Sequence, residues 1–297
     1  ARRESGSPAG LTRGQAVIAF IEKFLAVPEG AHVGRPVVLR PWQREVILGV
    51  YDGGTPARRA IISFARKNGK TALAAMLLLA HLVGPEARLN GQVYSAAQSR
   101  DQAAIVFALA AKMVRMNRVL DGSVGGLVTV RDSAKELFCA KTGTRYKALS
   151  AEATTAYGFS PSLVIHDELG QVRGPRSELY DALETAMGAQ EQPLSIIIST
   201  QAVEDADLLS VLIDDAKAQH DPRTRLFLYA ADETADVLDE AAWHAANPAL
   251  GDFNSLEQMR EAAGRAARLS SFEAAFRNLN LNQRVAAEAG FLSPSVW

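Results

Sequence analysis

The sequence predicts an α/β fold built on an open, mostly parallel sheet that is flanked by helices. Strand-like and helix-like patterns alternate between residues 60 and 203. Two of the strand-like runs, 163–165 and 196–198, are continuously apolar, as expected of parallel strands covered on both faces. The chain has 297 residues, of which 48% are hydrophobic, and this is enough for a sizeable core.

The elements can be justified in chain order. Residues 1–11 are rich in Ser, Gly, Pro and Arg and are expected to form a flexible tail. Thr12 is a helix-capping residue, and apolar residues at helical spacing predict a helix to about Leu25. A second helix is expected after Pro41. The predicted strands are 60–64, 92–96, 136–140, 163–166, 194–199 and 225–229, and the predicted helices between them are 71–83, 99–117 and 176–188.

The pattern changes after about residue 203. The runs 205–219, 235–246 and 255–280 are amphipathic at helical spacing, and Pro or Gly separates them. We therefore expect a core over residues 12–202 and a small helical subdomain over residues 203–290. The predicted strand near Leu226 would return to the main sheet or bridge the two parts.

Composition excludes several classes of protein. The formal net charge is −1, so contact with nucleic acid would need a local basic patch. The single cysteine, Cys139, excludes a disulfide framework and is expected to be a small core residue. No apolar run is long enough to span a membrane, and no secretory signal is present, so we expect a cytosolic protein. The chain stops at Trp297 shortly after a loop-like run, and we expect a fragment of something longer.

A phosphate-binding loop is predicted between the strand 60–64 and the helix 71–83. The loop residues are Arg66, Lys67, Asn68, Gly69, Lys70 and Thr71. Backbone N–H groups at a helix N-terminus attract anions. Lys70 is expected to reach the β- and γ-phosphates, and the Thr71 hydroxyl to bind Mg²⁺. The common pattern has a glycine where this chain has Phe64, and the alternative is a basic surface loop that caps a helix.

Two further strand ends supply the chemistry that such a loop needs. Asp167 and Glu168 follow an apolar strand, where Asp167 would hold Mg²⁺ and Glu168 would polarise the attacking water. Alone, an Asp-Glu pair is more often a helix N-terminus. Ser199, Thr200 and Gln201 follow the next apolar strand and are candidate sensors of the γ-phosphate, although a polar turn after a strand is common.

A glutamine before the first strand is a candidate for base recognition. Gln43 follows Arg40, Pro41 and Trp42, and its amide could accept from adenine N6 and donate to N7. Trp42 is expected to be a packing residue.

Together these segments resemble the large terminase subunit of tailed bacteriophages, in its HK97-like branch. The matching segments are 40–43, 65–71, 164–168, 199–201, 243–251 and 276–283. The resemblance implies an additional-strand P-loop NTPase with a helical lid, which hydrolyses ATP with Mg²⁺ and translocates double-stranded DNA into a procapsid. It also implies the portal protein and the small terminase subunit as partners, a ring on the portal formed by a chain that could be monomeric in solution, no membrane, and the cytoplasm of an infected bacterial host.

In the family, a nuclease domain follows the ATPase domain. Residues 291–297 would be the start of the linker to it, so the resemblance implies that nuclease activity is absent from this chain.

The chain departs from its relatives at the positions of two arginines. Tyr157 stands where many relatives have Arg before the metal-binding Asp, and Gln190 follows Gly188-Ala189 where HK97-like relatives have Arg. Arg66 is then a candidate cation acting within the subunit. Candidates for action on a neighbouring subunit are Arg145, Arg173 and Arg176.

Two other functions stay open on the sequence. Gln43 and the Asp-Glu pair also occur in superfamily 2-type helicases and remodelling ATPases; the sequence shows no second motor domain, although truncation could hide one. Phe64 in place of the glycine could mark a nucleotide-binding assembly scaffold that does not hydrolyse ATP.

Overall fold

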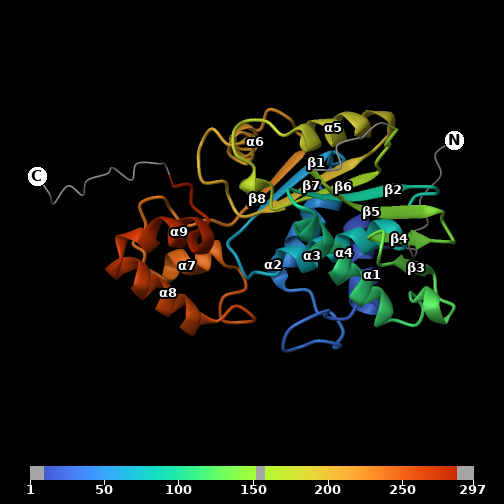
Figure 1. The fold of residues 1–297 in the computed structure, drawn as a ribbon, viewed down its shortest axis with the longest axis horizontal. Helices are drawn as coiled ribbons and strands as arrows, with labels where there is room; N and C mark the ends of the chain where they lie inside the picture. Colours follow the sequence, from blue (N-terminus) through green and yellow to red (C-terminus); the bar gives the residue numbers. More distant parts are fainter. Residues whose placement is uncertain (1–9, 152–157, 286–297) are drawn as a thin grey trace, which may run out of the picture.

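A single twisted sheet with helices on both faces forms the body of the protein in a computed structural model that describes residues 10–151 and 158–285. Helices α1 to α4 cover one face, α5 and α6 lie over the other, and α7 to α9 form a separate group beyond the end of the sheet near β1 and β8 (Figure 1). The α/β fold with a mostly parallel sheet is therefore confirmed.

Within the described residues the sheet has eight strands in the order β3-β4-β5-β2-β6-β7-β1-β8. All neighbouring pairs from β5 to β8 are parallel, while β3, β4 and β5 pair antiparallel. The strands are β1 (Arg59–Ser63), β2 (Gln92–Ala97), β3 (Val128–Arg131), β4 (Glu136–Cys139), β5 (Thr144–Ser150), β6 (Leu163–Asp167), β7 (Leu194–Ser199) and β8 (Thr224–Leu228).

The helices agree with most of the expected ranges. They are α1 (Arg13–Phe24), α2 (Pro41–Tyr51), α3 (Lys70–Leu82), α4 (Arg100–Arg115), α5 (Glu178–Ala186), α6 (Leu208–Lys217), α7 (Glu240–Ala246), α8 (Leu256–Arg268) and α9 (Ser270–Leu281). Thr12 caps α1 through a reciprocal capping box with Gln15. Short 3₁₀ turns occur at Gly122–Val124, Leu169–Gln171 and Met187–Ala189.

Three elements differ from the prediction. The strands β3 and β5 were not predicted, because β3 has only four residues and β5 alternates buried residues with the exposed Arg145 and Lys147 instead of forming an apolar run. The helix expected over 255–280 is instead two helices, broken at Leu269, where the backbone is extended (φ −129°, ψ 99°). The break lets α8 and α9 pack against each other around Met259 and Phe276.

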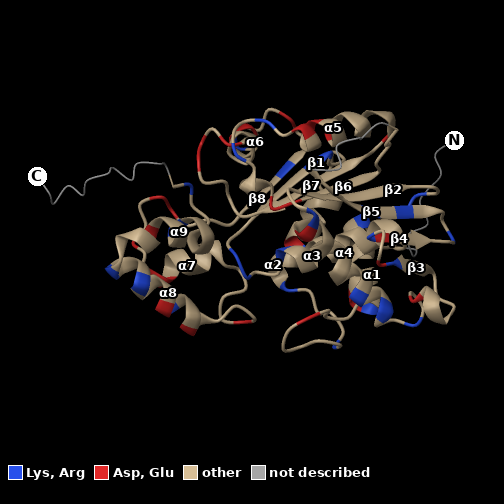
Figure 2. Ribbon diagram, viewed as in Figure 1, with Lys and Arg blue, Asp and Glu red and all other residues tan. Residues whose placement is uncertain are grey.

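The main core lies between the sheet and helices α1 to α4. Helix α3 is buried over nearly its whole length, and the central strands β1, β6 and β7 present apolar side chains to both faces. Cys139 is fully buried and unpaired, as expected of a core residue. Acidic and basic residues are interspersed over the ribbon, in line with the net charge of −1 (Figure 2).

Some of the expectations fall on residues that the structure does not describe. These are the first nine residues of the tail, Tyr157, and the linker 291–297. No helix among the described residues is long and apolar enough to cross a membrane.

His81 on α3 predicts an acid-sensitive stability. Its side chain is buried, Nε2 lies 2.8 Å from the Tyr51 hydroxyl, and burial lowers its pKa to about 4. The unfolded state takes up this proton near pH 6.5 and the folded state only near pH 4, so stability is lost as the pH falls through that window. The lost free energy of unfolding is about 3 kcal/mol at pH 4.

We expect denaturant titrations at pH 7 and pH 4 to show this loss. His81→Gln, which can still hydrogen-bond Tyr51, should lose about 3 kcal/mol less than the wild type over the same interval. Equal losses in the two proteins would show that His81 is not responsible.

Candidate functional site

The predicted phosphate loop lies at the carboxyl end of β1 and has an unusual backbone. Lys67 and Gly69 both have left-handed conformations, with φ of 64° and 76°. Helix α3 begins at Lys70 and has no side-chain cap at Gly69. The N–H groups of its first turn are therefore available to an anion, which the positive end of the helix also favours.

Lys70 is the buried cation of the site. Its Nζ donates to the Phe64 and Ala65 carbonyls, both at 3.2 Å, and to Thr200 Oγ1 at 3.0 Å, and it lies 3.6 Å from Glu168 Oε1. Burial lowers its pKa, while the carboxylates of Glu168 and Asp167 oppose that shift. Lys70 thus joins the phosphate loop to the ends of two other strands.

Phe64 occupies the position of the missing glycine without disturbing the loop. Its ring is fully buried and makes edge contacts with Trp42 and Tyr229, at centroid distances of 5.2 and 6.2 Å. Lys70 Nζ lies 5.5 Å from the same ring centroid, so the ring face also supports the ammonium. Trp42 is a packing residue here, as expected.

Asp167 ends β6 and is almost fully buried. Burial, and then the charge of Glu168, raise its pKa to about 7. Its Oδ1 has no hydrogen-bond partner among the described residues. An unpartnered buried carboxylate oxygen fits a divalent cation, and Mg²⁺ is commonly held by one or two protein ligands together with phosphates and water. The described residues contain no group of three or more acidic, His or Cys residues that could hold a metal by themselves.

Glu168 has a left-handed backbone (φ 53°) and is more exposed than Asp167. Its Oε2 lies 3.4 Å from both the Thr200 N–H and Ser199 Oγ. A pocket beside it is lined by Asp167, Ser177 and the end of β2. A non-glycine residue held in this conformation is a mark of functional sites, because the surrounding structure must offset the backbone strain.

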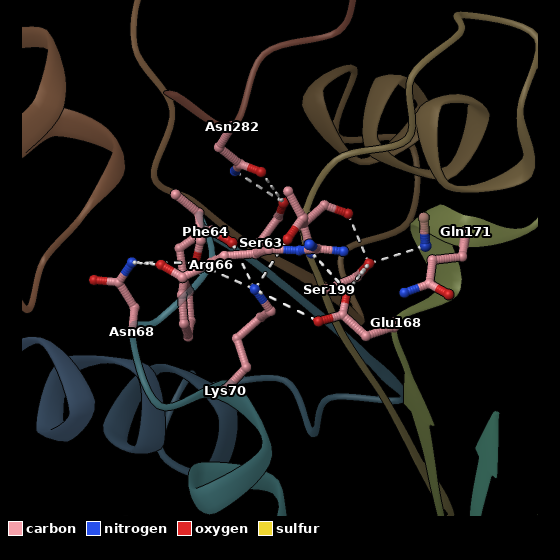
Figure 3. A network of polar contacts seen from close by, with 12 residues as sticks. Ser63, Phe64, Arg66, Asn68, Lys70, Glu168, Gln171, Ser199 and Asn282 are labelled. Carbon is pink, nitrogen blue, oxygen red and sulfur yellow. Dashed lines mark hydrogen bonds and ion pairs between the residues drawn. The ribbon is translucent and has the colours of Figure 1, made fainter. Parts of the chain in front are cut away.

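The end of β7 meets the same network. Ser199 Oγ accepts from the Gly170 N–H at 2.9 Å and donates to the Thr200 carbonyl at 2.6 Å. A Cβ on Gly170 would lie 2.3 Å from that carbonyl oxygen, so only glycine fits where these two chain segments meet. Figure 3 shows Lys70, Glu168 and Ser199 in this one network of polar contacts.

Gln201 contacts Asn282, a residue of the matching segment 276–283 that was not predicted to take part in the site. The Gln201 N–H donates to Asn282 Oδ1 at 2.7 Å, and its side chain donates to the Asn282 carbonyl. Asn282 Nδ2 donates to Ser63 Oγ at 3.1 Å and to the Tyr229 carbonyl at 2.8 Å. Asn282 follows α9, is fully buried and is left-handed (φ 53°). It therefore joins the ends of β1, β7 and β8 to the C-terminal helices (Figure 3).

A second amide contact links the phosphate loop to those helices. Asn68 Nδ2 donates to Asn247 Oδ1 at 2.8 Å, and Asn68 Oδ1 accepts from the Ala249 N–H at 3.0 Å. Asn247 in turn donates to the carbonyls of Trp243 and Asn280. The Asn68 side chain thus connects the phosphate loop to the segment that follows α7. The sequence feature that could have indicated these amide contacts is the recurrence of asparagines at or next to predicted helices, at 247, 278, 280 and 282.

The remaining predicted residues lie around this network. The Arg66 backbone N–H donates to the Leu279 carbonyl at 2.9 Å, and the charge of its exposed side chain contributes to the lowered pKa of Lys70. Lys67 extends to Gln258 Oε1 at 3.0 Å. Thr71 is partly buried in the first turn of α3.

Gln43 is already used in part by the chain itself. It is buried, and its Oε1 accepts from the Arg40 N–H at 2.9 Å as part of the cap of α2. One lone pair of Oε1 and the Nε2 group remain for a ligand, so the predicted contacts with a base stay a prediction.

The three candidate arginines for action on a neighbouring subunit are exposed. Arg145 lies on β5 with its guanidinium 5.9 Å from the Phe138 ring centroid. Arg173 pairs with Asp207 at 3.2 Å, and Arg176 lies in the same loop before α5. Within the described part of one subunit, these arginines are not among the partners of Lys70 or Glu168.

Comparisons with known proteins identify relatives of the whole chain. The profile of the terminase large subunit ATPase domain matches residues 41–217. The large terminase subunit of Enterobacteria phage HK97 is 53% identical over 287 residues, which are 97% of this chain and 56% of that protein. The crystal structure of the HK97 large terminase matches with a TM-score of 0.87 at 52% identity, covering 97% of this chain and 58% of that one.

A more distant structure shares the fold. The large terminase of a thermophilic bacteriophage, solved in complex with ADP, matches with a TM-score of 0.55 at 12% identity, covering 83% of this chain and 54% of that one. The chain thus spans somewhat more than half the length of these full-length large terminases.

A second profile match does not support one expectation. The profile of the terminase large subunit endonuclease domain matches residues 220–297, whereas we expected a lid over residues 203–290, the start of a linker over residues 291–297 and no nuclease activity. In the described part of that range, β8 pairs with β1 in the main sheet, and α7 to α9 pack beside the phosphate loop. The amphipathic runs after residue 203 indicate helices, but such a pattern does not tell which domain profile these residues match.

Proposed function

Because this chain belongs to the family of terminase large subunits, through the ATPase domain of that family, we propose that it is the ATP-hydrolysing motor part of a viral DNA-packaging machine. It would convert ATP hydrolysis into translocation of double-stranded DNA into a procapsid. The observation that carries this proposal is the contact of one buried ammonium, Lys70 Nζ, with the phosphate loop, with Thr200 and with Glu168.

Each side chain of the network has a role that fits its surroundings. Lys70 is buried and cationic, so it would hold the β- and γ-phosphates and offset the charge that develops on them. Glu168 faces the pocket and would orient a water molecule and accept its proton. Thr200 contacts both Lys70 and Glu168, Ser199 contacts Glu168, and the two would sense whether the γ-phosphate is present. Arg66 would add positive charge from the loop.

Magnesium fits the donor set beside the loop. Thr71 and Asp167 would hold the ion, and the unpartnered Oδ1 of Asp167 supports this assignment. When bound, Mg²⁺ neutralises phosphate charge. The remaining loop residues, Lys67, Asn68 and Gly69, would contribute backbone N–H groups, since the side chains of Lys67 and Asn68 are directed to the C-terminal helices.

The partners follow from the family and are proposed with it. They are double-stranded DNA, the portal protein of the procapsid, the small terminase subunit and further copies of this chain in a ring, all in the cytoplasm of an infected bacterium. A packaging motor must hold any sequence, so DNA binding should be independent of sequence and weaken with salt. Arg145, Arg173 and Arg176 remain the candidates for a cation supplied to a neighbouring subunit.

The boundaries of the two domains are proposed in the same way. Residues 12–202 would form the ATPase core and residues 203–290 the lid subdomain with a returning strand, which is β8 in the main sheet. Asn247 and Asn282 support this division, because they are among the points where the C-terminal helices contact the phosphate loop and the sheet. The helicase and scaffold alternatives are not favoured by the relatives that match this chain.

The metal requirement provides a direct test. ATP hydrolysis, measured as phosphate release, should fall to background when EDTA removes divalent ions and return when Mg²⁺ is added in excess. The physical reason is that Asp167 and Glu168 would otherwise repel the phosphates with only Lys70 and Arg66 to oppose them. Undiminished hydrolysis in EDTA would contradict the proposed site, and so would the absence of phosphate release under every condition with DNA and procapsids present.

A further inference from the structure

Phe253 lies against the phosphate loop although it belongs to the C-terminal helices. It sits in the turn between α7 and α8, and its ring carbons Cε2 and Cζ are 3.4 Å from the position that a Cβ on Gly69 would take. The residue nevertheless remains 43% exposed. A large aromatic ring that touches the loop and still faces solvent offers a free surface to a flat ligand.

The turn that carries Phe253 is fixed relative to the loop. The Ala249 N–H donates to Asn68 Oδ1 at 3.0 Å, and Asn254 Nδ2 donates to Asn247 Oδ1 at 3.3 Å. The turn closes on itself through the Gly251 N–H and the Asn254 carbonyl at 2.8 Å. These bonds determine where the ring lies, so its position does not depend on a flexible side chain alone.

A second planar group lies beside the ring. The Arg40 guanidinium carbon is 5.4 Å from the Phe253 ring centroid. Asp252, the neighbour of Phe253, holds this guanidinium through Oδ2 at 2.6 Å and Oδ1 at 3.2 Å. Arg40 is also the N-cap residue of α2, the helix that carries Gln43. The ring and the guanidinium therefore lie together beside the loop, next to the start of the helix that carries the predicted base-reading residue.

Gln43 offers hydrogen bonds to the edge of a base but no surface for its face. Its Oε1 already accepts from the Arg40 N–H, which leaves one lone pair and the Nε2 group for a ligand. Stacking on an aromatic ring requires no particular hydrogen-bonding edge, since every base has a π-face.

We propose that Phe253, supported by Arg40, is the surface on which the base of the bound nucleotide stacks. The proposal rests on the proposed function, because the phosphates of the same nucleotide must occupy the loop. Phe253 would be a binding residue supplied by the C-terminal helices, and it would add affinity for any purine nucleotide more than preference for adenine over guanine.

The test compares a nucleotide with the same phosphates lacking a base. Binding of ATP and of inorganic tripolyphosphate is measured by calorimetry for the wild type, Phe253→Ala, Phe253→Tyr and Phe272→Ala. Phe272 is a matched control, since it is 46% exposed on α9 and has the Arg265 guanidinium 5.8 Å from its ring centroid. Melting curves establish that each variant is folded.

Phe253→Ala should weaken ATP binding about 5- to 150-fold and leave tripolyphosphate binding unchanged. Phe253→Tyr and Phe272→Ala should bind both ligands as the wild type does. Unchanged ATP binding by Phe253→Ala, an equal change for both ligands, or tighter binding of tripolyphosphate would overturn the proposal. Failure of the wild type to bind either ligand would instead refute the proposed function.

Discussion

Replacing Lys70 by alanine should reduce ATP hydrolysis by about 10²- to 10³-fold. The change removes the buried ammonium that contacts Thr200 and lies 3.6 Å from Glu168. The N–H groups of the α3 first turn would remain, but no buried positive charge would offset the charge developing on the phosphates. Asp167, whose pKa is already raised to about 7, would lose the ammonium that opposes this shift, and its pKa would rise further.

The measurement is steady-state phosphate release over a range of ATP concentrations. Lys112→Ala is the matched control, because Lys112 lies on α4, outside the phosphate loop, and its Nζ pairs with Glu29. It should stay within a few-fold of the wild type. A Lys70→Ala protein that melts normally and hydrolyses ATP at the wild-type rate would refute the role of Lys70.

Replacing Glu168 by glutamine should lower kcat by about 10²- to 10⁴-fold while ATP affinity is retained. Glutamine has nearly the same shape, and its amide oxygen can still accept from the Thr200 N–H. It cannot take a proton from water, however. The change also removes a charge that raises the pKa of Asp167, so Asp167 should ionise more readily and metal binding should not weaken.

Single-turnover hydrolysis and nucleotide binding, measured on one preparation, separate these effects. Glu178→Gln is the matched control, since Glu178 is an exposed residue in the first turn of α5. Loss of binding in Glu168→Gln, without a change in the rate of the bound fraction, would mean that Glu168 holds the ligand and has no part in the chemistry.

The central network could be predicted from the sequence for a geometric reason. Lys70, Glu168 and Thr200 each follow a parallel strand, and the carboxyl ends of such strands lie at one edge of the sheet. An apolar strand followed by polar residues therefore places each of them correctly before any contact is known. Phe64 could also be recognised as a departure, although only the structure shows its ring packing against Trp42 and Tyr229.

The contacts made by the C-terminal helices could not be predicted in this way. Asn247 and Asn282 reach the site because α7 to α9 pack against it, and no local pattern specifies how two amphipathic groups of elements will meet. For the same reason, the contacts made by Gln43 and Phe253 could not be predicted from the sequence. The sequence places Gln43 near the loop, but only the folded chain shows that its carbonyl oxygen is used in a helix cap while an aromatic ring from residue 253 lies beside the loop.

The two asparagine contacts have a consequence for how the protein responds to its surroundings. Asn68 with Asn247, and Gln201 with Asn282, connect the nucleotide site to the C-terminal helices through neutral amides that are shielded from water. Ionic strength screens charges, and acidity acts on groups that bind protons, but neither changes an amide near neutral pH. The contacts between the nucleotide site and the C-terminal helices should therefore be equally strong at low and at physiological ionic strength, whereas DNA binding should weaken as the salt concentration rises.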